Sequence, residues 1–261
     1  MSAVGEDGER AQLVATGWDT PLVHERTSAP FEVPTGDQVA VRVEACGVCH
    51  RDLIDRAGRF PFQRVPIVPG HEAAGVVVAV GPGVKDFAVG DRVATMHRDA
   101  CGSCPACARG ETSLCTGAAW VFGILADGGY ASHLLAPASA LYPLPRDLPP
   151  TVAATLHCTF GTAYRDLVTL GRIRSGERVL VTGANGGVGR AAVQIGVRFG
   201  AEVVAVVRDE KHAAPLRALG AREVVVSAGP FHDRTGEVDL ALDTVGAATF
   251  LSTLRTLRVG G

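Results

Sequence analysis

Hydrophobic and polar positions follow one period up to about residue 147 and another period after it. In the first part, along QVAVRVEA (38–45), Val39, Val41 and Val43 fall on one face and Arg42 and Glu44 on the other, the pattern of a strand with one buried face. The run GVVVAVG (75–81) consists mainly of β-branched valines and ends in a Gly-Pro-Gly turn. Further strand candidates, GDRVATM and GGYASHLLAP, come after other turn residues. We therefore expect an all-β, barrel-like domain with long loops.

From about residue 147 the spacing becomes that of helices and strands in alternation. The segment ERVLVTGANGGVGRAAVQIGVRFGAEVVAVVR (177–208) predicts strand, glycine-rich turn, helix and strand, and the chain continues in the same manner. Such alternation is typical of a parallel sheet covered on both faces. The proline-rich YPLPRDLPP (142–150) lies between the two textures, so we expect domains at 1–147 and 148–261.

Composition places the chain among ordinary globular proteins and removes some functions. Its 261 residues are 47% hydrophobic and 20% charged, with a formal net charge of −2. This balance argues against nucleic acid as a partner, and no apolar run reaches the roughly 20 residues of a membrane span. The first residues, MSAVGEDGER, have no apolar segment of the kind found in a signal peptide. We expect a cytoplasmic protein that acts on a small molecule.

Four of the seven cysteines fall within CGSCPACARGETSLC (101–115). In a reducing compartment, clustered cysteines are more often metal ligands than disulfides, and an odd total argues against a complete disulfide set. Four thiolates at this spacing can close a tetrahedral zinc site that holds a small lobe, here about 97–118, in shape. The alternative is a loop of reactive surface thiols. The predicted structural zinc ligands are Cys101, Cys104, Cys107 and Cys115.

The glycine-rich turn predicts a nucleotide-binding edge. Glycines between a strand and a helix let the backbone approach a pyrophosphate, which the helix N-terminus then binds, although such a turn can also serve packing alone. The residues expected at the phosphates are Gly183, Gly186, Gly187, Val188 and Gly189. The second strand ends at Val207 and Arg208, where NAD-binding proteins place an acid. Arg208 favours NADP(H) over NAD(H), while Asp209 and Glu210 keep NAD(H) open.

A second metal constellation is scattered along the chain. Cys49, His71 and Cys158 would give the Cys₂His set of a catalytic zinc with an open position. Glu72 is an alternative ligand or a neighbouring carboxylate, and Asp52 is a candidate for orienting His71. Spacing alone does not establish the set, because a lone cysteine is often a small buried apolar residue. The remaining candidates are interpreted as core or surface residues: Cys46, His24, His97, His133, His212 and His232.

The motifs CGVCHRD, PGHEAAGVV, VGDRV, CGSCPACARGETSLC, GGYA, VTGANGGVG and DTVG together give a family resemblance. From about residue 20 to the end, the chain resembles the zinc-containing medium-chain dehydrogenase/reductases, the alcohol dehydrogenase group. The resemblance implies a GroES-like β-barrel domain followed by a Rossmann domain, with two zinc ions per chain. It implies that Cys49, His71 and Cys158 bind the catalytic zinc beside Glu72, and that His50 and Thr162 lie near the cofactor.

The function favoured by the sequence is zinc-dependent, NAD(P)(H)-linked hydride transfer with a small alcohol or carbonyl compound. Alcohol-oxidising members of the family commonly carry Ser or Thr two residues after the first zinc cysteine, where this chain has Arg51. A guanidinium cannot relay a proton as a hydroxyl does. The alternative is therefore an enoyl or quinone reductase acting on an activated double bond. A third hypothesis is a non-catalytic, zinc-stabilised fragment.

Three further expectations concern the C-terminus, the oligomeric state and the substrate pocket. The chain stops at LRTLRVGG, whereas the family continues into more Rossmann strands, so a C-terminally truncated sequence is expected. A homo-oligomer is usual for the family, but the truncation makes it doubtful here. An apolar substrate pocket would draw on aromatic residues that can equally be ordinary core: Phe60, Phe62, Trp120 and Phe122.

Overall fold

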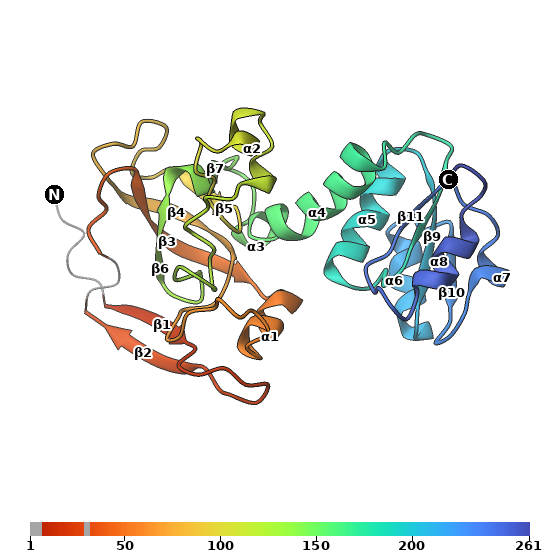
Figure 1. The fold of residues 1–261 in the computed structure, drawn as a ribbon, viewed down its shortest axis with the longest axis horizontal. Helices are drawn as coiled ribbons and strands as arrows, with labels where there is room; N and C mark the ends of the chain where they lie inside the picture. The colour runs from red at the N-terminus through yellow and green to blue at the C-terminus, as the bar shows by residue number, and fades with distance from the viewer. Residues whose placement is uncertain (1–6, 29–31) are drawn as a thin grey trace. The chain divides into compact units, whose positions relative to one another are not determined.

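A computed structural model describes residues 7–28 and 32–261 of the chain. The chain divides into two compact units, one ending at Cys158 and the other beginning at Thr159 (Figure 1). The domain boundary expected from the proline-rich segment, at 147/148, falls earlier than this division. The first six residues of the polar N-terminus lie outside the described residues.

The first unit is built on an antiparallel sheet with strand order β6-β3-β4-β5-β7. A separate antiparallel pair, β1-β2, completes its strands (Figure 1). The strands are β1 (Gly8–Gln12), β2 (Val23–Thr27), β3 (Gln38–Gly47), β4 (Glu72–Val80), β5 (Arg92–Thr95), β6 (His133–Pro137) and β7 (Leu141–Pro143). The all-β character expected of the first part of the sequence is confirmed.

Strand β3 departs from the two-faced pattern expected of residues 38–45. Val39, Ala40 and Val41 are buried in succession, and only from Arg42 onward do exposed and less exposed positions alternate. The pairing register with β4 shifts between Ala40 and Val41, as at a β-bulge, which turns neighbouring side chains toward the same face. The buried valines pack with residues of the other strands, including Val77.

The helices of the first unit are short and sit in its connections. They are α1 (His50–Arg56), α2 (Pro105–Ala108), α3 (Pro150–Ala153), the 3₁₀ turns η1 (Thr112–Leu114) and η2 (Ala138–Ala140), and the π-helical turn η3 (Leu156–Phe160). Ala153 and Ala154 pack with Ala74 and Ala94 of the sheet, which is why the first unit extends past the proline-rich segment. In the described parts of the chain, no helix has the length and apolarity needed to cross a membrane.

The second unit is a parallel sheet with order β10-β9-β8-β11. Its strands are β8 (Arg178–Val181), β9 (Glu202–Val207), β10 (Glu223–Val226) and β11 (Leu240–Leu242). Its helices are α4 (Gly161–Tyr164), η4 (Arg165–Leu170), α5 (Gly187–Arg198), η5 (Glu210–His212), α6 (Ala213–Ala218), α7 (His232–Thr235) and α8 (Phe250–Thr256). The chain runs outward from β8 to β10 and returns to the other side of β8, creating the order reversal at which such sheets bind ligands.

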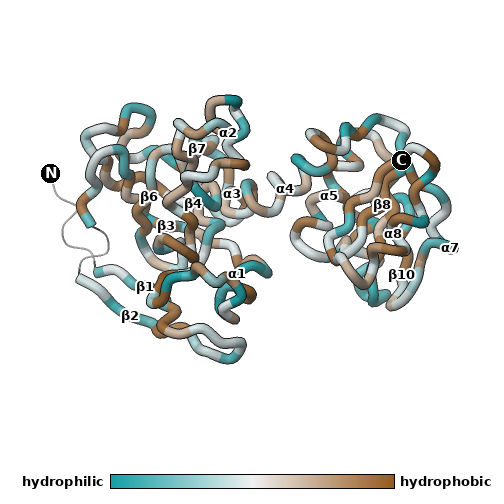
Figure 2. The backbone as a smooth tube through the Cα atoms, in the orientation of Figure 1, coloured by the Kyte–Doolittle hydropathy of each residue, from teal (hydrophilic) through white to brown (hydrophobic). Residues whose placement is uncertain are grey.

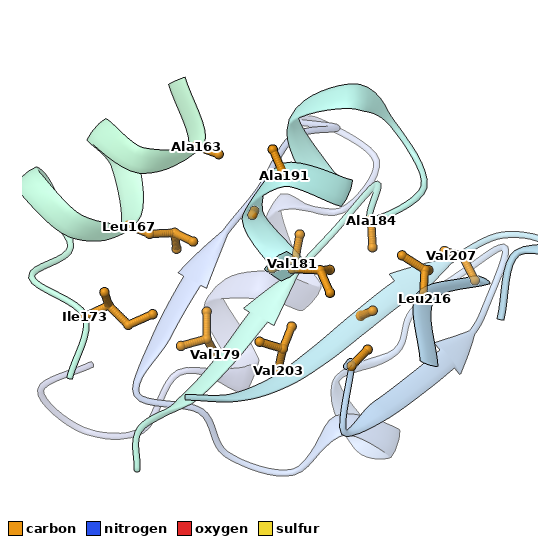
Figure 3. Close-up of a cluster of buried hydrophobic side chains, with 14 residues drawn as sticks. Ala163, Leu167, Ile173, Val179, Val181, Ala184, Ala191, Val203, Val207 and Leu216 are labelled. Carbon is orange, nitrogen blue, oxygen red and sulfur yellow. The ribbon is translucent and has the colours of Figure 1, made fainter. Parts of the chain in front are cut away.

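Apolar side chains cover both faces of this sheet. Val179 and Val181 lie in one cluster with residues of α4, η4 and α5, as Figure 3 shows, and Leu180 between them lies in the opposite cluster with Phe231 and Val238. The hydropathy colouring is correspondingly brown around β8 (Figure 2). The expected doubly covered parallel sheet is confirmed.

Candidate active site

The first unit gathers four potential metal ligands that are scattered in the sequence. Ligand atoms of Cys49, His71, Glu72 and Cys158 all lie within 4.8 Å of one another. Strand pairing explains the meeting of the first three, because Gly47 at the end of β3 stands opposite Glu72 at the start of β4. Cys49 is the N-cap of α1, two residues after the end of β3, and His71 directly precedes β4. Cys158 arrives from the turn η3.

The donor set and its spacing fit zinc. The Sγ atoms of Cys49 and Cys158 are 3.9 Å apart. Two Zn–S bonds of about 2.3 Å at a tetrahedral angle would separate the sulfurs by about 3.8 Å. Nε2 of His71 is buried and has no hydrogen-bond partner among the described residues, while the side chain as a whole is 1% exposed. A buried, unpaired nitrogen beside two sulfurs is accounted for by a metal ligand.

Asp52 lies on the other side of His71 and joins two of the ligands. Its Oδ1 is 3.2 Å from His71 Nδ1. Its Oδ2 accepts hydrogen bonds from the Cys49 backbone N–H at 2.8 Å and from the Tyr130 hydroxyl at 2.9 Å. A carboxylate that holds Nδ1–H leaves Nε2 of the same ring free to bind a metal.

The electrostatics of the cluster favour the metal-binding form at Cys49 and the protonated form at Cys158 and His71, whose protons a bound metal would displace. Contact with Cys158 is the largest influence on Cys49 and, with help from His71, lowers the pKa of Cys49 to about 4. The same contact and burial raise the pKa of Cys158. Burial opposes the charge on His71, but Asp52 and Cys49 outweigh it and raise the pKa of His71 to about 9. A thiol of low pKa supplies the thiolate that zinc binds.

Arg51 is held by its own neighbours. Its Nε is 3.0 Å from Oδ2 of Asp55, a residue that is fully buried, and its guanidinium also donates to the backbone oxygen of Phe122. Both contacts run to protein groups of the first unit, so two of the three guanidinium nitrogens of this side chain are already engaged.

Two histidines lie close to the cluster and were interpreted from the sequence as ordinary residues or not singled out. Nδ1 of His97 is 2.9 Å from Nε2 of His157, and the two rings stack with centroids 5.2 Å apart. Burial, followed by the nearby His157 and Arg51, lowers the pKa of His97 to about 4. The one sequence signal was the position of His157 directly before Cys158.

The second cysteine cluster is local. Cys101, Cys104, Cys107 and Cys115 also bring their sulfurs within 4.8 Å of one another. Backbone N–H groups of Cys104 and Cys101 each lie 3.3 Å from a cluster sulfur. Gly102 and Gly110 adopt positive φ of 72° and 79°, which lets the chain reverse tightly around the sulfurs. Four thiols and no other ligand type fit a closed structural zinc site.

At the carboxyl edge of the parallel sheet, the turn from β8 to α5 exposes backbone groups that could bind a ligand, because it is rich in glycine. Gly183 has φ of 56°, and no side chain caps the N-terminus of α5 at Gly187. A Cβ on Gly189 would lie 2.4 Å from the Gly183 oxygen and 2.7 Å from Ala184 Cα. The uncapped N–H groups at a helix start fit the phosphates of a dinucleotide.

The other residues expected at the cofactor are distributed over both units. Arg208 is exposed directly after β9, while Asp209 turns its carboxylate to the backbone N–H of Lys211 at 3.0 Å and to its Nζ at 2.7 Å. Thr162 is exposed on α4, which packs against α5. His50 belongs to the first unit, exposed at the start of α1, and its place near a cofactor stays a prediction.

A β domain with a Cys₂His cluster, followed by a nucleotide-binding parallel sheet, defines a class of zinc-dependent oxidoreductases. Residues 35–146 match the family described as "Alcohol dehydrogenase GroES-like domain" and residues 187–261 match "Zinc-binding dehydrogenase". The chain belongs to the zinc-containing medium-chain dehydrogenase/reductase family. The expected fold class, a GroES-like domain followed by a Rossmann-like domain, is confirmed.

Individual relatives carry two different chemistries in their names. The chain is 34% identical over 235 residues to an acryloyl-coenzyme A reductase of Sulfurisphaera tokodaii, covering 89% of this chain and 70% of that protein. It is 38% identical over 238 residues to an alcohol dehydrogenase of Geobacillus stearothermophilus, covering 86% and 68%. The crystal structure of AibC matches with a TM-score of 0.92 and 41% identity, covering 99% of this chain and 74% of that one.

Proposed function

We propose that the chain is an NADPH-linked reductase of an activated carbon–carbon double bond, such as an enone or an enoyl thioester. The sequence alone favoured alcohol or carbonyl chemistry and kept double-bond reduction as the alternative. The observation that reverses this preference is the engagement of Arg51, whose Nε is 3.0 Å from Asp55 and whose guanidinium also donates to Phe122.

The argument concerns the proton. Interconversion of an alcohol and a carbonyl moves a proton on or off the substrate oxygen, and the family resemblance assigns the start of that relay to a hydroxyl at the position of Arg51. An arginine side chain stays protonated in proteins and has no acceptor atom, so it cannot take part in such a relay. Reduction of a conjugated double bond delivers its proton to carbon and has no need of this step. The name of the acryloyl-coenzyme A reductase is in keeping with the proposal.

The residues of the scattered cluster each have a proposed role. Cys49, His71 and Cys158 hold the catalytic zinc, with Glu72 as a further ligand available in the same cluster. When bound, zinc supplies a Lewis acid for a substrate oxygen that gains negative charge during the reaction. Asp52 holds the Nδ1 proton of His71 and so keeps Nε2 directed to the metal.

The reaction balances with one cofactor and one proton. When bound, NADPH would supply the hydride for the β-carbon of the substrate. The electron pair of the double bond would move toward the conjugated carbonyl, and the α-carbon would take a proton from solvent. The products are NADP⁺ and the saturated compound. The chain binds the two reactants, orients them and excludes competing reactions.

The choice of NADPH rests on the end of β9. Arg208 is exposed there, and Asp209, the acid that could accept from a ribose hydroxyl, already bonds Lys211. An arginine suits a 2′-phosphate, whereas NAD-binding sheets place a free carboxylate near this edge. The phosphates would meet the backbone of Gly186, Gly187, Val188 and Gly189 at the start of α5.

The four-cysteine lobe is proposed to hold a second, structural zinc. All seven cysteines are free thiols in the structure. Free thiols in two metal clusters suit a reducing compartment, and the cytoplasm remains the proposed location.

Carbonyl reduction or alcohol oxidation is the second candidate, favoured by the 38% identity to an alcohol dehydrogenase. A substrate panel with NADPH separates the two: enoyl thioesters and enones on one side, ketones, aldehydes and alcohols on the other. We expect higher kcat/KM for the double-bond substrates, and deuterium from [4-²H]NADPH at the β-carbon by mass spectrometry. Deuterium at a carbonyl carbon, with ketones as better substrates, would support the second candidate.

The variant Arg51→Thr tests the reason for the preference. A hydroxyl at this position should raise alcohol oxidation relative to the wild type, while double-bond reduction should not gain. No turnover of any substrate by a protein that holds zinc only at the four-cysteine lobe would favour the non-catalytic hypothesis.

A further inference from the structure

Tyr130 is not among the expected site residues, yet its hydroxyl reaches the metal cluster. It donates a 2.9 Å hydrogen bond to Oδ2 of Asp52, across 78 positions of sequence. Resting on the proposed function, we propose that Tyr130 is a positioning residue for the catalytic zinc site, acting through Asp52 on Cys49 and His71.

The loop that carries Tyr130 is bonded directly to the segment that carries His71. Gly128 N–H donates to Val68, Gly129 N–H to Gly70 at 2.9 Å, and Tyr130 N–H to Pro69 at 3.0 Å. On its other side, the Tyr130 carbonyl accepts from Ala11 N–H of β1 at 2.8 Å. The backbone of Tyr130 is therefore fixed relative to the residues directly before His71.

The close approach of these two segments depends on small residues. A Cβ on Gly128 would lie 1.9 Å from the Gly70 oxygen, and a Cβ on Gly129 would lie 2.7 Å from Ala73 Cβ. A Cβ on Gly70 would meet Cδ1 of Tyr130 at 2.7 Å. No Cβ fits at these contacts without displacing backbone or ring, so the loop is shaped to bring the aromatic ring against the metal-binding segment.

Asp52 is the link through which the hydroxyl would act. Its Oδ2 has two donors, Tyr130 Oη and the Cys49 backbone N–H, and its Oδ1 faces Nδ1 of His71. The side chain of Asp52 is only 6% exposed, so water does not easily replace a lost donor. Removing the hydroxyl would loosen the carboxylate that fixes both the backbone of one ligand and the ring of another. Loss of such outer partners typically weakens metal binding about 10- to 100-fold.

Tyr130→Phe is the direct test, because it keeps the ring against Gly70 and removes only the oxygen. The measurement is zinc affinity of the full chain by competition with a chromophoric chelator. The chelator should remove two zinc ions in two steps. Because Cys158→Ser and Cys104→Ser each disable one cluster, they show which step belongs to which cluster. We expect Tyr130→Phe to weaken zinc binding at the Cys49, His71 and Cys158 cluster by about 10- to 100-fold. Zinc binding at the four-cysteine lobe should be unchanged.

Tyr142→Phe is the matched control. Tyr142 is another half-buried tyrosine of the first unit, but its hydroxyl is not among the donors to Asp52. Its loss should leave both zinc affinities at wild-type values. In an Asp52→Ala background, Tyr130→Phe should have little further effect, because the atom through which it acts is absent.

Cobalt substitution provides a second measurement that packing alone would not change. The visible d–d bands of Co²⁺ at the scattered cluster should shift in Tyr130→Phe and not in Tyr142→Phe. Wild-type zinc affinity and wild-type cobalt spectra in Tyr130→Phe would overturn the positioning role while leaving the proposed function intact. A wild-type protein that holds zinc only at the four-cysteine lobe would overturn both.

Discussion

The metal cluster of the first unit is formed by side chains, whereas the glycine turn of the second unit is formed by backbone. The cluster is made of side chains from separate segments, converging to within 4.8 Å. The glycine turn is made of backbone from one continuous segment, where Gly189 has no room for a Cβ. The first site is therefore sensitive to the removal of atoms, and the second to their addition.

The largest effect is expected from removing a sulfur at the cluster. Cys158→Ser should lower kcat by about 1000-fold, since Lewis-acid stabilisation of a transition state is worth several kcal/mol. The zinc content should fall from two to one per chain, with little change in circular dichroism. Cys46→Ala is the matched control, because Cys46 belongs to neither described cluster and should keep both zinc ions and the activity. Equal losses in the two variants would contradict the difference drawn between them.

At the glycine turn, the addition of one methyl group should be costly. Gly189→Ala forces a Cβ against the backbone of Gly183 and Ala184, and we expect a loss of about 1–3 kcal/mol in unfolding free energy, together with weaker NADPH binding. Urea unfolding and cofactor fluorescence measure the two effects. Gly187→Ala is the control for stability, since its Cβ would meet only Thr159 side-chain atoms at 3.5 Å or more. A tolerated Gly189→Ala would show that the turn yields more readily than its contacts imply.

The one side chain proposed to contribute at the nucleotide edge gives a more selective effect. Arg208→Ala should weaken NADPH binding by about 10- to 100-fold, the worth of a charge-assisted contact to phosphate, and leave NADH binding nearly unchanged. Isothermal titration with both cofactors measures the ratio. A parallel fall in the two affinities would instead assign Arg208 to general binding.

The smallest effect is expected beside the turn, at a side chain that serves structure. Asp243 comes directly after β11 and accepts hydrogen bonds from Thr182, Thr249 and the backbone N–H groups of Val245 and Gly246. Burial opposes its charge, but these donors outweigh burial and lower the pKa of Asp243. Asp243→Asn leaves donors unmatched and should cost about 1–2 kcal/mol at neutral pH.

The pH dependence of this variant distinguishes charge from shape. Because the folded-state pKa of Asp243 lies below its ordinary value of 3.8, the added stability is fully present above that value. It is lost as the pH falls through the lowered pKa. The difference in unfolding free energy between wild type and Asp243→Asn should thus be constant near neutrality and shrink in acid. A difference independent of pH would assign the effect to hydrogen-bond geometry alone.

The sequence predicted local features well and long-range ones poorly. The glycine turn and the four-cysteine lobe each lie within one short segment of sequence, so the spacing of their residues was enough to predict them. Cys49, His71 and Cys158 needed the family resemblance, because it is the pairing of Gly47 with Glu72 that makes the first two neighbours. The hydrogen bond from Tyr130 to Asp52 had no sequence signal except an aromatic residue after two glycines.

Regular periods also concealed irregular structure. The bulge at Ala40 interrupts the regular placement of Val39, Val41 and Val43 on one face that the sequence suggested. The proline-rich segment suggested a boundary at 147/148, whereas Ala153 and Ala154 pack into the first unit and carry its edge on to Cys158. In both places tertiary packing outweighs the local pattern.

Because η3 is a π-helical turn, the direction of the Cys158 side chain depends on the number of residues in the turn as well as on their types. Deleting one residue between the start of η3 and Cys158 would change the rotational phase of the Cys158 side chain by about 100° relative to the chain that precedes it. A point replacement of a neighbour such as Leu156 leaves that rotational phase untouched. Insertions and deletions in this stretch should therefore be far more damaging than conservative exchanges, so the length of the turn is itself a part of the binding site.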